Sequence, residues 1–224
     1  MTQSLPTLAV LGGSGALGAA LCLRWAKAGY PLVIGTRDPA KTDAADAVRA
    51  AFPGASVRPL AYADAARAGE IAALTVPYAA HRTTLEAVRE AVQGKILIDA
   101  TAPLRPPKVG TVQLPPEGSA AKAAQEFLGA GVRVVSAFQD VAAHKLAHVD
   151  ETIDCDVLVT GNDQDAREAV IRLVEAAGLR GWHAGPIENS AAAEAITSVL
   201  IAINRRYKID GAGIRITGVP GSRG

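Results

Sequence analysis

Short, continuous apolar runs alternate with longer amphipathic stretches along most of this chain. The runs are typical of strands buried on both faces, and the longer stretches carry apolar residues at helical spacing. Strands are expected at Leu8–Leu11, Leu32–Ile34, Ser56–Leu60, Glu70–Val76, Lys95–Ala100, Val132–Phe138, Asp156–Thr160 and Arg180–Ala184. Helices are expected at Gly15–Ala28, Ala79–Val92, Ser119–Leu128 and Asp163–Ala177, with a last one from Asn189. This alternation through short connections predicts a doubly wound, mostly parallel α/β sheet.

The first apolar run is followed at once by three glycines with the spacing Gly13-x-Gly15-x-x-Gly18. Glycines at this spacing give a tight turn, close approach of the backbone to a pyrophosphate, and close packing of helix on strand. The helix that follows supplies free N–H groups and a positive dipole end for phosphates. An ordinary glycine-rich turn is the alternative, but the position between strand and helix favours a Rossmann-type dinucleotide site.

The end of the second predicted strand indicates which dinucleotide binds. NAD-preferring folds place an acidic residue there to bond the ribose 2′-hydroxyl. This chain has Thr36 and Arg37 instead, with Lys41 shortly after them. A guanidinium can hold a 2′-phosphate with two hydrogen bonds, whereas a carboxylate would repel the phosphate. The pattern therefore favours NADP, and the alternative is a solvated basic turn with Asp38 as the local partner of the cations.

One long segment, Ala102 to Gly118, fits neither helix nor strand because it carries many prolines. They are Pro103, Pro106, Pro107, Pro115 and Pro116. The segment leaves the fifth predicted strand at the sheet edge where ligands bind in such folds. It is expected either to wall the site or to be a plain surface excursion.

The last third of the chain reads as a further β-α-β unit followed by a final helix. We expect residues 1–145 to form the NADP-binding Rossmann domain, and residues 146–224 to form an extension that completes the substrate pocket. The final helix carries an apolar stripe, made of Ile196, Val199, Leu200 and Ile203. Little chain follows to cover this stripe, so a two-fold homodimer is expected.

Composition excludes several other classes of protein. Of 224 residues, 49% are hydrophobic, which supports a large core, and the net charge of +1 gives no field directed at nucleic acid or an acidic membrane. The two cysteines, Cys22 and Cys155, show no metal or disulfide spacing and fit a cytoplasmic protein. No signal peptide or membrane span is expected.

Several stretches, in order along nearly the whole chain, resemble the family of NADPH-dependent reductases of coenzyme F420, also called F420H2:NADP oxidoreductases. The stretches are Gly12-Gly-Ser-Gly15, Ile34-Gly-Thr-Arg37, Leu74-Thr-Val-Pro-Tyr78, Val134-Val-Ser-Ala-Phe138, Cys155-Asp-Val-Leu-Val159, Ala184-Gly-Pro-Ile-Glu-Asn189 and Ala212-Gly-Ile-Arg-Ile-Thr217. The resemblance implies a small, cytoplasmic, oligomeric oxidoreductase. It also implies hydride transfer between NADP(H) and the deazaflavin F420.

The resemblance also implies a set of site residues. Ser14, Gly15, Ala16 and Leu17 would hold the pyrophosphate, and Thr36, Arg37 and Lys41 the 2′-phosphate. Tyr78, Ala102 and Ala143 would line the ribose and nicotinamide, and Gly213 would border the deazaflavin pocket. Gln139 departs from the family, in which His is often found, so a proton relay at this position is in doubt.

Hydride transfer between two carbon centres needs no metal and no protein nucleophile, so we assign no catalytic acid or base. Gln139 or backbone N–H groups would ease negative charge on the reduced deazaflavin. The four histidines, His81, His144, His148 and His183, are expected at the surface or in helix packing. Arg205, Arg206, Lys208 and Arg215 would either attract the anionic tail of F420 or be solvated. An NADPH-dependent reductase of an imine, flavin or metal, and a non-catalytic NADP sensor, are the alternative functions.

Overall fold

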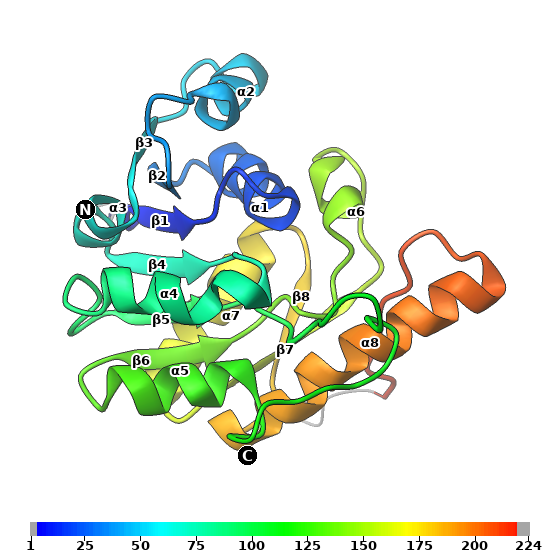
Figure 1. Cartoon of the computed structure of the whole chain (residues 1–224). Helices are drawn as coiled ribbons and strands as arrows, with labels where there is room; N and C mark the ends of the chain where they lie inside the picture. Colours follow the sequence, from blue (N-terminus) through cyan, green and yellow to red (C-terminus); the bar gives the residue numbers. More distant parts are fainter. Residues whose placement is uncertain (1–3, 219–224) are drawn as a thin grey trace.

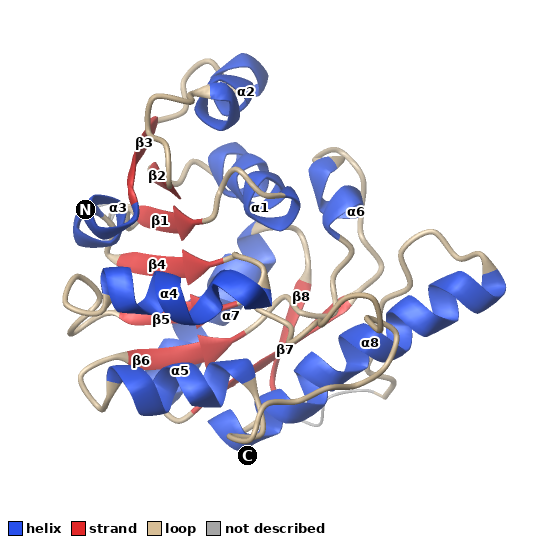
Figure 2. Ribbon diagram, viewed as in Figure 1, coloured by secondary structure: helices blue, strands red, loops and turns tan. Residues whose placement is uncertain are grey.

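A computed structural model describes residues 4–218, which form one eight-stranded sheet with helices on both faces (Figures 1 and 2). The strands are β1 (Leu8–Leu11), β2 (Leu32–Thr36), β3 (Val57–Ala61), β4 (Ile71–Leu74), β5 (Ile96–Asp99), β6 (Arg133–Ser136), β7 (Asp156–Gly161) and β8 (Arg180–His183). The helices are α1 (Ala16–Lys27), α2 (Asp43–Ala51), α3 (Tyr62–Ala68), α4 (Tyr78–Val88), α5 (Ala120–Leu128), α6 (Ala143–Ala147), α7 (Gln164–Ala176), the 3-10 turn η1 (Ile187–Asn189) and α8 (Ser190–Tyr207).

The strand order is β3-β2-β1-β4-β5-β6-β7-β8, and the chain reverses direction across the sheet after β3. Neighbouring strands are parallel except for β6 and β7, which pair antiparallel, while β7 and β8 are parallel again. The predicted Rossmann-type sheet, extended by a C-terminal β-α-β unit and a final helix, is therefore confirmed.

The core has two layers, one on each face of the sheet, and β1 supplies both. Leu8 and Val10 face the cluster shared with α1, α6 and α7, whereas Ala9 and Leu11 face the cluster shared with α3, α4 and α5. This division explains why β1 is a continuous apolar run. Trp25, fully buried, donates its indole N–H to the Leu173 carbonyl (2.9 Å) and so joins α1 to α7.

Three short helices, α2, α3 and α6, were not expected from the sequence. They are rich in alanine and carry few large apolar residues, so their helical periodicity is weak. Helix α6 is held by a distant side chain, because buried Arg24 on α1 donates to the carbonyls of Leu146 (2.9 Å) and His148 (2.7 Å).

Two irregular segments pack on the outer elements of the fold. The proline-rich segment between β5 and α5 forms no helix or strand, as predicted, and passes in front of α8 (Figure 1). The C-terminal segment lies beside the start of β7. There the Asp156 N–H donates to the Ile214 carbonyl (2.8 Å), and the Ile216 N–H donates to the Asp156 carboxylate (2.7 Å). Within residues 4–218, no helix is long and apolar enough to cross a membrane.

Candidate functional site

A cleft of about 720 Å³ opens beyond the carboxyl ends of β1, β2 and β4. Its walls come from the glycine-rich turn, the end of β2, and the first turns of α3 and α4. The lining residues are Gly12, Ser14, Gly15, Thr36, Arg37, Asp38, Lys41, Tyr62, Thr75, Val76, Pro77, Ala79, Ala80, Thr83 and Thr84. The structure thus brings two of the residues predicted for the pyrophosphate, Ser14 and Gly15, to one cleft with those predicted for the 2′-phosphate, at the sheet edge where such folds bind ligands.

The glycine-rich turn lets the backbone pass unusually close to β4. A Cβ added at Gly18 would lie 2.5 Å from Thr75 Oγ1 and 2.6 Å from the carbonyl oxygen of Gly12. Gly12, which precedes the predicted fingerprint, has a φ of +92° that favours glycine. The turn therefore requires glycine at positions 12 and 18, of which the fingerprint identifies only Gly18.

The residues predicted for the pyrophosphate differ in whether their backbone N–H groups are available to a ligand. The Gly15 N–H donates to the Gly12 carbonyl (2.9 Å), so this amide closes the turn and is not free for a ligand. Ala16 and Leu17 open α1, and the first N–H groups of a helix have no acceptor within it. These N–H groups fit an anion at the mouth of the cleft, although neither side chain lines it.

At the other side of the cleft, the end of β2 presents cations that are not neutralised locally. The Asp38 carboxylate accepts the Ala40 N–H (3.2 Å), and the Asp38 N–H donates to Thr36 Oγ1 (3.3 Å). No ion pair joins Asp38 to Arg37 in the described part of the chain. Tyr62, which the sequence did not single out, also lines this side; burial raises the pKa of its hydroxyl, and Arg37 opposes that rise.

The residues predicted to surround the nicotinamide follow three neighbouring strands. Tyr78 begins α4 after β4, Ala102 follows β5, and Ala143 begins α6 after β6. None of them lines the large cleft. Tyr78 lines a neighbouring cavity of about 300 Å³ with His81 and Glu117. The residues predicted for the nicotinamide therefore lie outside the large cleft, along the sheet edge from β4 toward β6.

Gly213 lies further along, in a third cavity of about 260 Å³ that it shares with Ala142 and Cys155. A Cβ added at Gly213 would lie 2.6 Å from the Cys155 sulfur. Packing against Cys155 is therefore by itself a sufficient reason for a glycine here. This contact joins two residues far apart in sequence, so no local pattern indicated it.

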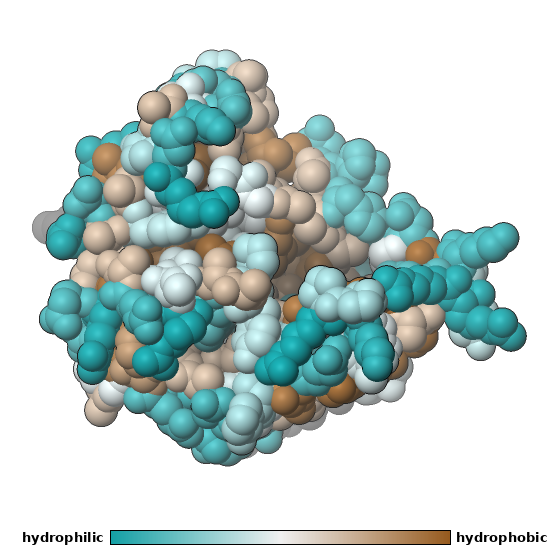
Figure 3. All heavy atoms as spheres, viewed as in Figure 1, coloured by the Kyte–Doolittle hydropathy of each residue, from teal (hydrophilic) through white to brown (hydrophobic). Residues whose placement is uncertain are grey.

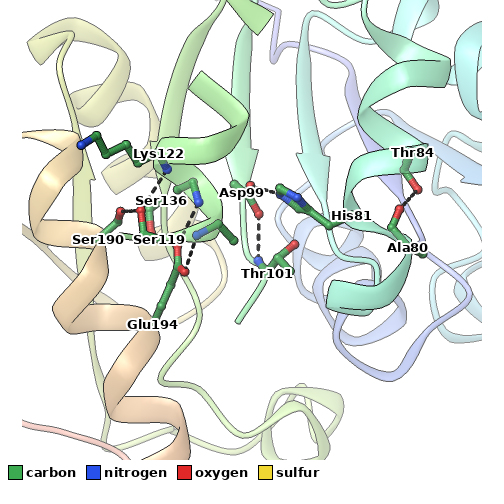
Figure 4. A network of polar contacts seen from close by, with 12 residues as sticks. Ala80, His81, Thr84, Asp99, Thr101, Ser119, Lys122, Ser136, Ser190 and Glu194 are labelled. Carbon is green, nitrogen blue, oxygen red and sulfur yellow. Dashed lines mark hydrogen bonds and ion pairs between the residues drawn. The ribbon is translucent and has the colours of Figure 1, made fainter. Parts of the chain in front are cut away.

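A buried ion pair lies behind the strand ends (Figure 4). His81 Nε2 is 2.6 Å from Asp99 Oδ2, and Asp99 Oδ1 accepts the Thr101 N–H (2.9 Å). Burial alone would lower the pKa of His81, but the charge of Asp99 and the hydrogen bond to it raise that pKa above its ordinary value. The expectation that all four histidines are surface or plain packing residues is wrong for His81, because it forms this pair. The pair holds the end of β5, from which Ala102 continues.

Gln139 belongs to the same network. Its amide group donates to the Asp99 carbonyl (2.7 Å) and to Ser136 Oγ (2.8 Å). Both amide hydrogens are therefore committed within the protein. The expectation that Gln139 eases negative charge on a bound deazaflavin does not fit this geometry, so Gln139 is better described as a residue that positions the ends of β5 and β6.

A second buried carboxylate fixes the final helix to the start of α5. Glu194 on α8 accepts the N–H groups of Ala120 (2.6 Å) and Ala121 (3.0 Å), and Ser119 caps α5 as predicted. Burial raises the pKa of Glu194 to about 8 against the effect of these two donors. Figure 4 shows Glu194 pointing from α8 to this helix end. The contact fixes α8 at the point where the proline-rich segment that follows β5 ends and α5 begins.

Together, the glycine-rich turn, the free N–H groups of α1 and the cations that follow β2 define a Rossmann-type protein that binds a phosphorylated dinucleotide. Among residues 4–218 no group of three or more His, Cys, Asp or Glu side chains is arranged to hold a metal ion. The family model described as "NADP oxidoreductase coenzyme F420-dependent" matches residues 7–103.

Two relatives described as F420-dependent NADP reductases match almost the whole chain. The one from Methanothermobacter thermautotrophicus is 40% identical over 222 residues, which cover 95% of each protein. The one from Methanocaldococcus jannaschii is 37% identical over 219 residues, which cover 94% of this chain and 97% of the relative. The chain belongs to the family of F420-dependent NADP reductases, as the sequence resemblance implied.

Solved structures agree with this assignment at the level of the fold. A crystal structure from Arthrobacter sp. FB24, described as a candidate F420-dependent NADP reductase, superposes with a TM-score of 0.80 at 26% identity. It covers 96% of this chain and 100% of its own. An imine reductase from Bacillus cereus superposes with a TM-score of 0.65 at 17% identity, over 62% of its length. That lower identity shows a shared fold only.

Proposed function

We propose that this protein is an oxidoreductase that transfers a hydride between NADP(H) and coenzyme F420. The observation that carries the proposal is the cleft that joins the glycine-rich turn to Thr36, Arg37 and Lys41, in a chain of the F420-dependent NADP reductase family. Ser14, Ala16 and Leu17 would hold the pyrophosphate, and Gly15, which lines the cleft without a free N–H, would allow the backbone to approach it. Tyr78, Ala102 and Ala143 would flank the nicotinamide, and Gly213 would border the deazaflavin.

In this proposal the protein acts by binding and orientation. The two coenzymes carry the chemistry, because a hydride passes directly from one ring carbon to the other. The chain's contribution is to hold the two rings in contact and to exclude water. The His81–Asp99 pair and Gln139 support this by fixing the ends of β5 and β6, and no protein nucleophile is required.

The direct test is turnover of purified F420 with NADPH, followed by the absorbance of the oxidised deazaflavin. We expect turnover with NADPH and much less with NADH. Turnover of an imine, a flavin or a metal ion in place of F420 would support the alternative enzymes. Tight NADPH binding without turnover of any acceptor would support a non-catalytic sensor.

We also propose a cytoplasmic homodimer that uses α8. Val199 is 45% exposed on this helix although Leu200 beside it is 8% exposed, so the predicted stripe is only partly covered within one chain. We expect the mass of a dimer in solution at micromolar concentration. We expect Val199→Glu to shift it toward the monomer, since a charge would be buried in the interface. A monomeric wild-type protein would show that the stripe needs no partner.

The role of Gly213 can be separated from its packing. We expect Gly213→Val to reduce F420 turnover strongly and NADPH affinity little, because a side chain would displace the deazaflavin from the nicotinamide. The matched variant is Gly213→Val with Cys155→Ala, which removes the sulfur that lies 2.6 Å from an added Cβ. If turnover returns in the double variant, position 213 acts through packing, not through the deazaflavin. Steady-state kinetics and NADPH fluorescence titration measure both effects.

In functional terms, residues 1–145 would then hold the dinucleotide and residues 146–224 would complete the second pocket. The C-terminal segment fits this division, because it is anchored to β7 through Asp156 and packs against the start of α6 at Ala142.

A further inference from the structure

Three cations lie on the proline-rich segment and on the part of α8 against which Gly110 of that segment packs. Arg105 and Lys108 belong to that segment, and Arg205 lies near the end of α8. All three residues are exposed, and none of them forms an ion pair with another residue in the described range 4–218. We call them the loop–helix cation cluster. Unpaired cations gathered on one surface attract anions.

The segment that carries Arg105 and Lys108 has a defined shape. The Lys108 N–H donates to the Arg105 carbonyl (3.1 Å), and the amide of Gln113 donates to the carbonyls of both residues (3.4 and 3.1 Å). Gly110 then lies against α8, where a Cβ added to it would be 3.7 Å from Arg205 Nη1. The folded segment therefore holds the exposed Arg105 and Lys108 on a stretch of chain that packs against α8 beside Arg205, and hydrophilic residues gather where it crosses α8 (Figure 3).

This cluster adjoins the part of the site assigned to the nicotinamide and the second substrate. The Arg105 guanidinium lies 5.6 Å from the centre of the Tyr78 ring, and Arg105 follows Ala102 by three residues. Arg37 and Lys41 follow β2, which is separated from β5 by β1 and β4. Cations thus follow both β2 and β5 along this edge of the sheet. The phosphates of the dinucleotide account only for the cations that follow β2.

The structure also divides the cations that the sequence grouped together. Arg215 pairs with Asp154 and Asp156, so its charge is already compensated. Arg205 forms no ion pair within residues 4–218, and Gly110, which follows Lys108 by two residues, packs against α8 beside its guanidinium. The cations that lie close together in sequence at the end of α8 and after it are therefore not the set that forms the loop–helix cation cluster.

We propose that the loop–helix cation cluster binds the phosphate and carboxylates of the anionic tail of the second substrate. The inference rests on the proposed function, because F420 carries such a tail beyond its ribityl chain. The deazaflavin ring would lie on the nicotinamide, and the tail would leave the site over the proline-rich segment toward α8. The segment would thus act as one wall of the second substrate's site.

The test compares F420 with a deazaflavin analogue that ends at the ribityl chain and lacks phosphate and glutamates, at saturating NADPH. For the wild-type protein we expect a KM for F420 at least about tenfold below that for the analogue, since exposed charge pairs contribute modestly and several act together. Each of Arg105→Ala, Lys108→Ala and Arg205→Ala should raise the KM for F420 about two- to fivefold. The KM for the analogue should not change.

The matched control is Arg172→Ala, an exposed arginine on α7 that lies outside the cluster. We expect it to leave both KM values unchanged. Added salt should raise the KM for F420 more than the KM for the analogue, because exposed charges are screened. The triple variant should have similar KM values for F420 and for the analogue.

The outcomes separate this inference from the function on which it rests. Turnover of neither compound by the wild-type protein would overturn the proposed function and the inference together. Turnover of both with equal KM would overturn the inference alone. So would a triple variant that still prefers F420 as strongly as the wild-type protein does.

Discussion

Arg37→Ala should raise the KM for NADPH about ten- to a hundredfold and leave the KM for NADH nearly unchanged. The guanidinium lines the cleft beside Thr36 and Lys41, and Asp38 does not neutralise it because its carboxylate caps the following turn. Charge-assisted hydrogen bonds to a phosphate contribute about 1.5–3 kcal/mol, which gives this range. Only NADPH carries the 2′-phosphate, so only its binding should weaken. Steady-state kinetics with each nucleotide at fixed F420 measures the change.

Arg58→Ala is a suitable control, because Arg58 is an exposed arginine on the neighbouring strand β3 that does not line the cleft. It should alter neither KM. Equal losses for NADPH and NADH in Arg37→Ala would mean that Arg37 contacts a part common to both nucleotides, and the assignment of the 2′-phosphate site would be wrong.

Asp99→Ala should lower the free energy of unfolding by about 3–5 kcal/mol, because it leaves a buried imidazole without its partner. Asp99 is fully buried and also accepts the Thr101 N–H, so the variant strands a second polar group. The midpoint of thermal unfolding should fall by roughly 10 °C for a chain of this size. Asp64→Ala, which removes an exposed pair with Arg67 on α3, should cost less than about 1 kcal/mol.

A double-mutant cycle with His81→Ala assigns the loss to the pair. We expect a coupling above about 1 kcal/mol at pH 6 and a smaller one at pH 9. The pKa of His81 is raised in the folded protein, so its contribution is complete below the ordinary histidine value of about 6.5 and is lost as pH rises through the raised value. Additive losses at pH 6 would show that the two side chains do not stabilise each other.

The glycine-rich turn and the cations that line the large cleft were predictable because their signals are local in sequence. The run Leu8–Leu11, the glycines that follow it and the helix after them are adjacent elements, and their spacing identifies the turn directly. The cations after β2 could be interpreted for the same reason, since their place relative to the strand is fixed by the chain. Ser119 was likewise recognisable as a helix cap from its position alone.

The remaining features depend on contacts between distant segments. His81 and Asp99 lie on different elements, and Glu194 reaches the start of α5 from more than 70 residues away. No local period encodes such pairs, because they form only when packing fixes the distances between helices and strands. Tyr62 enters the cleft by the same route, from a short helix whose weak pattern gave no signal.

The sequence by itself therefore determined the class of fold, the family, the position of the glycine-rich turn and the preference expected for NADP, because each of these signals lies in short stretches of adjacent residues. Only the tertiary structure decided that Gln139 is committed to the ends of β5 and β6, that Arg215 is paired, and that the segment carrying Arg105 and Lys108 packs against α8 beside Arg205. Hydrogen bonding and charge compensation depend on which neighbours are within about 3–4 Å, and packing sets those neighbours.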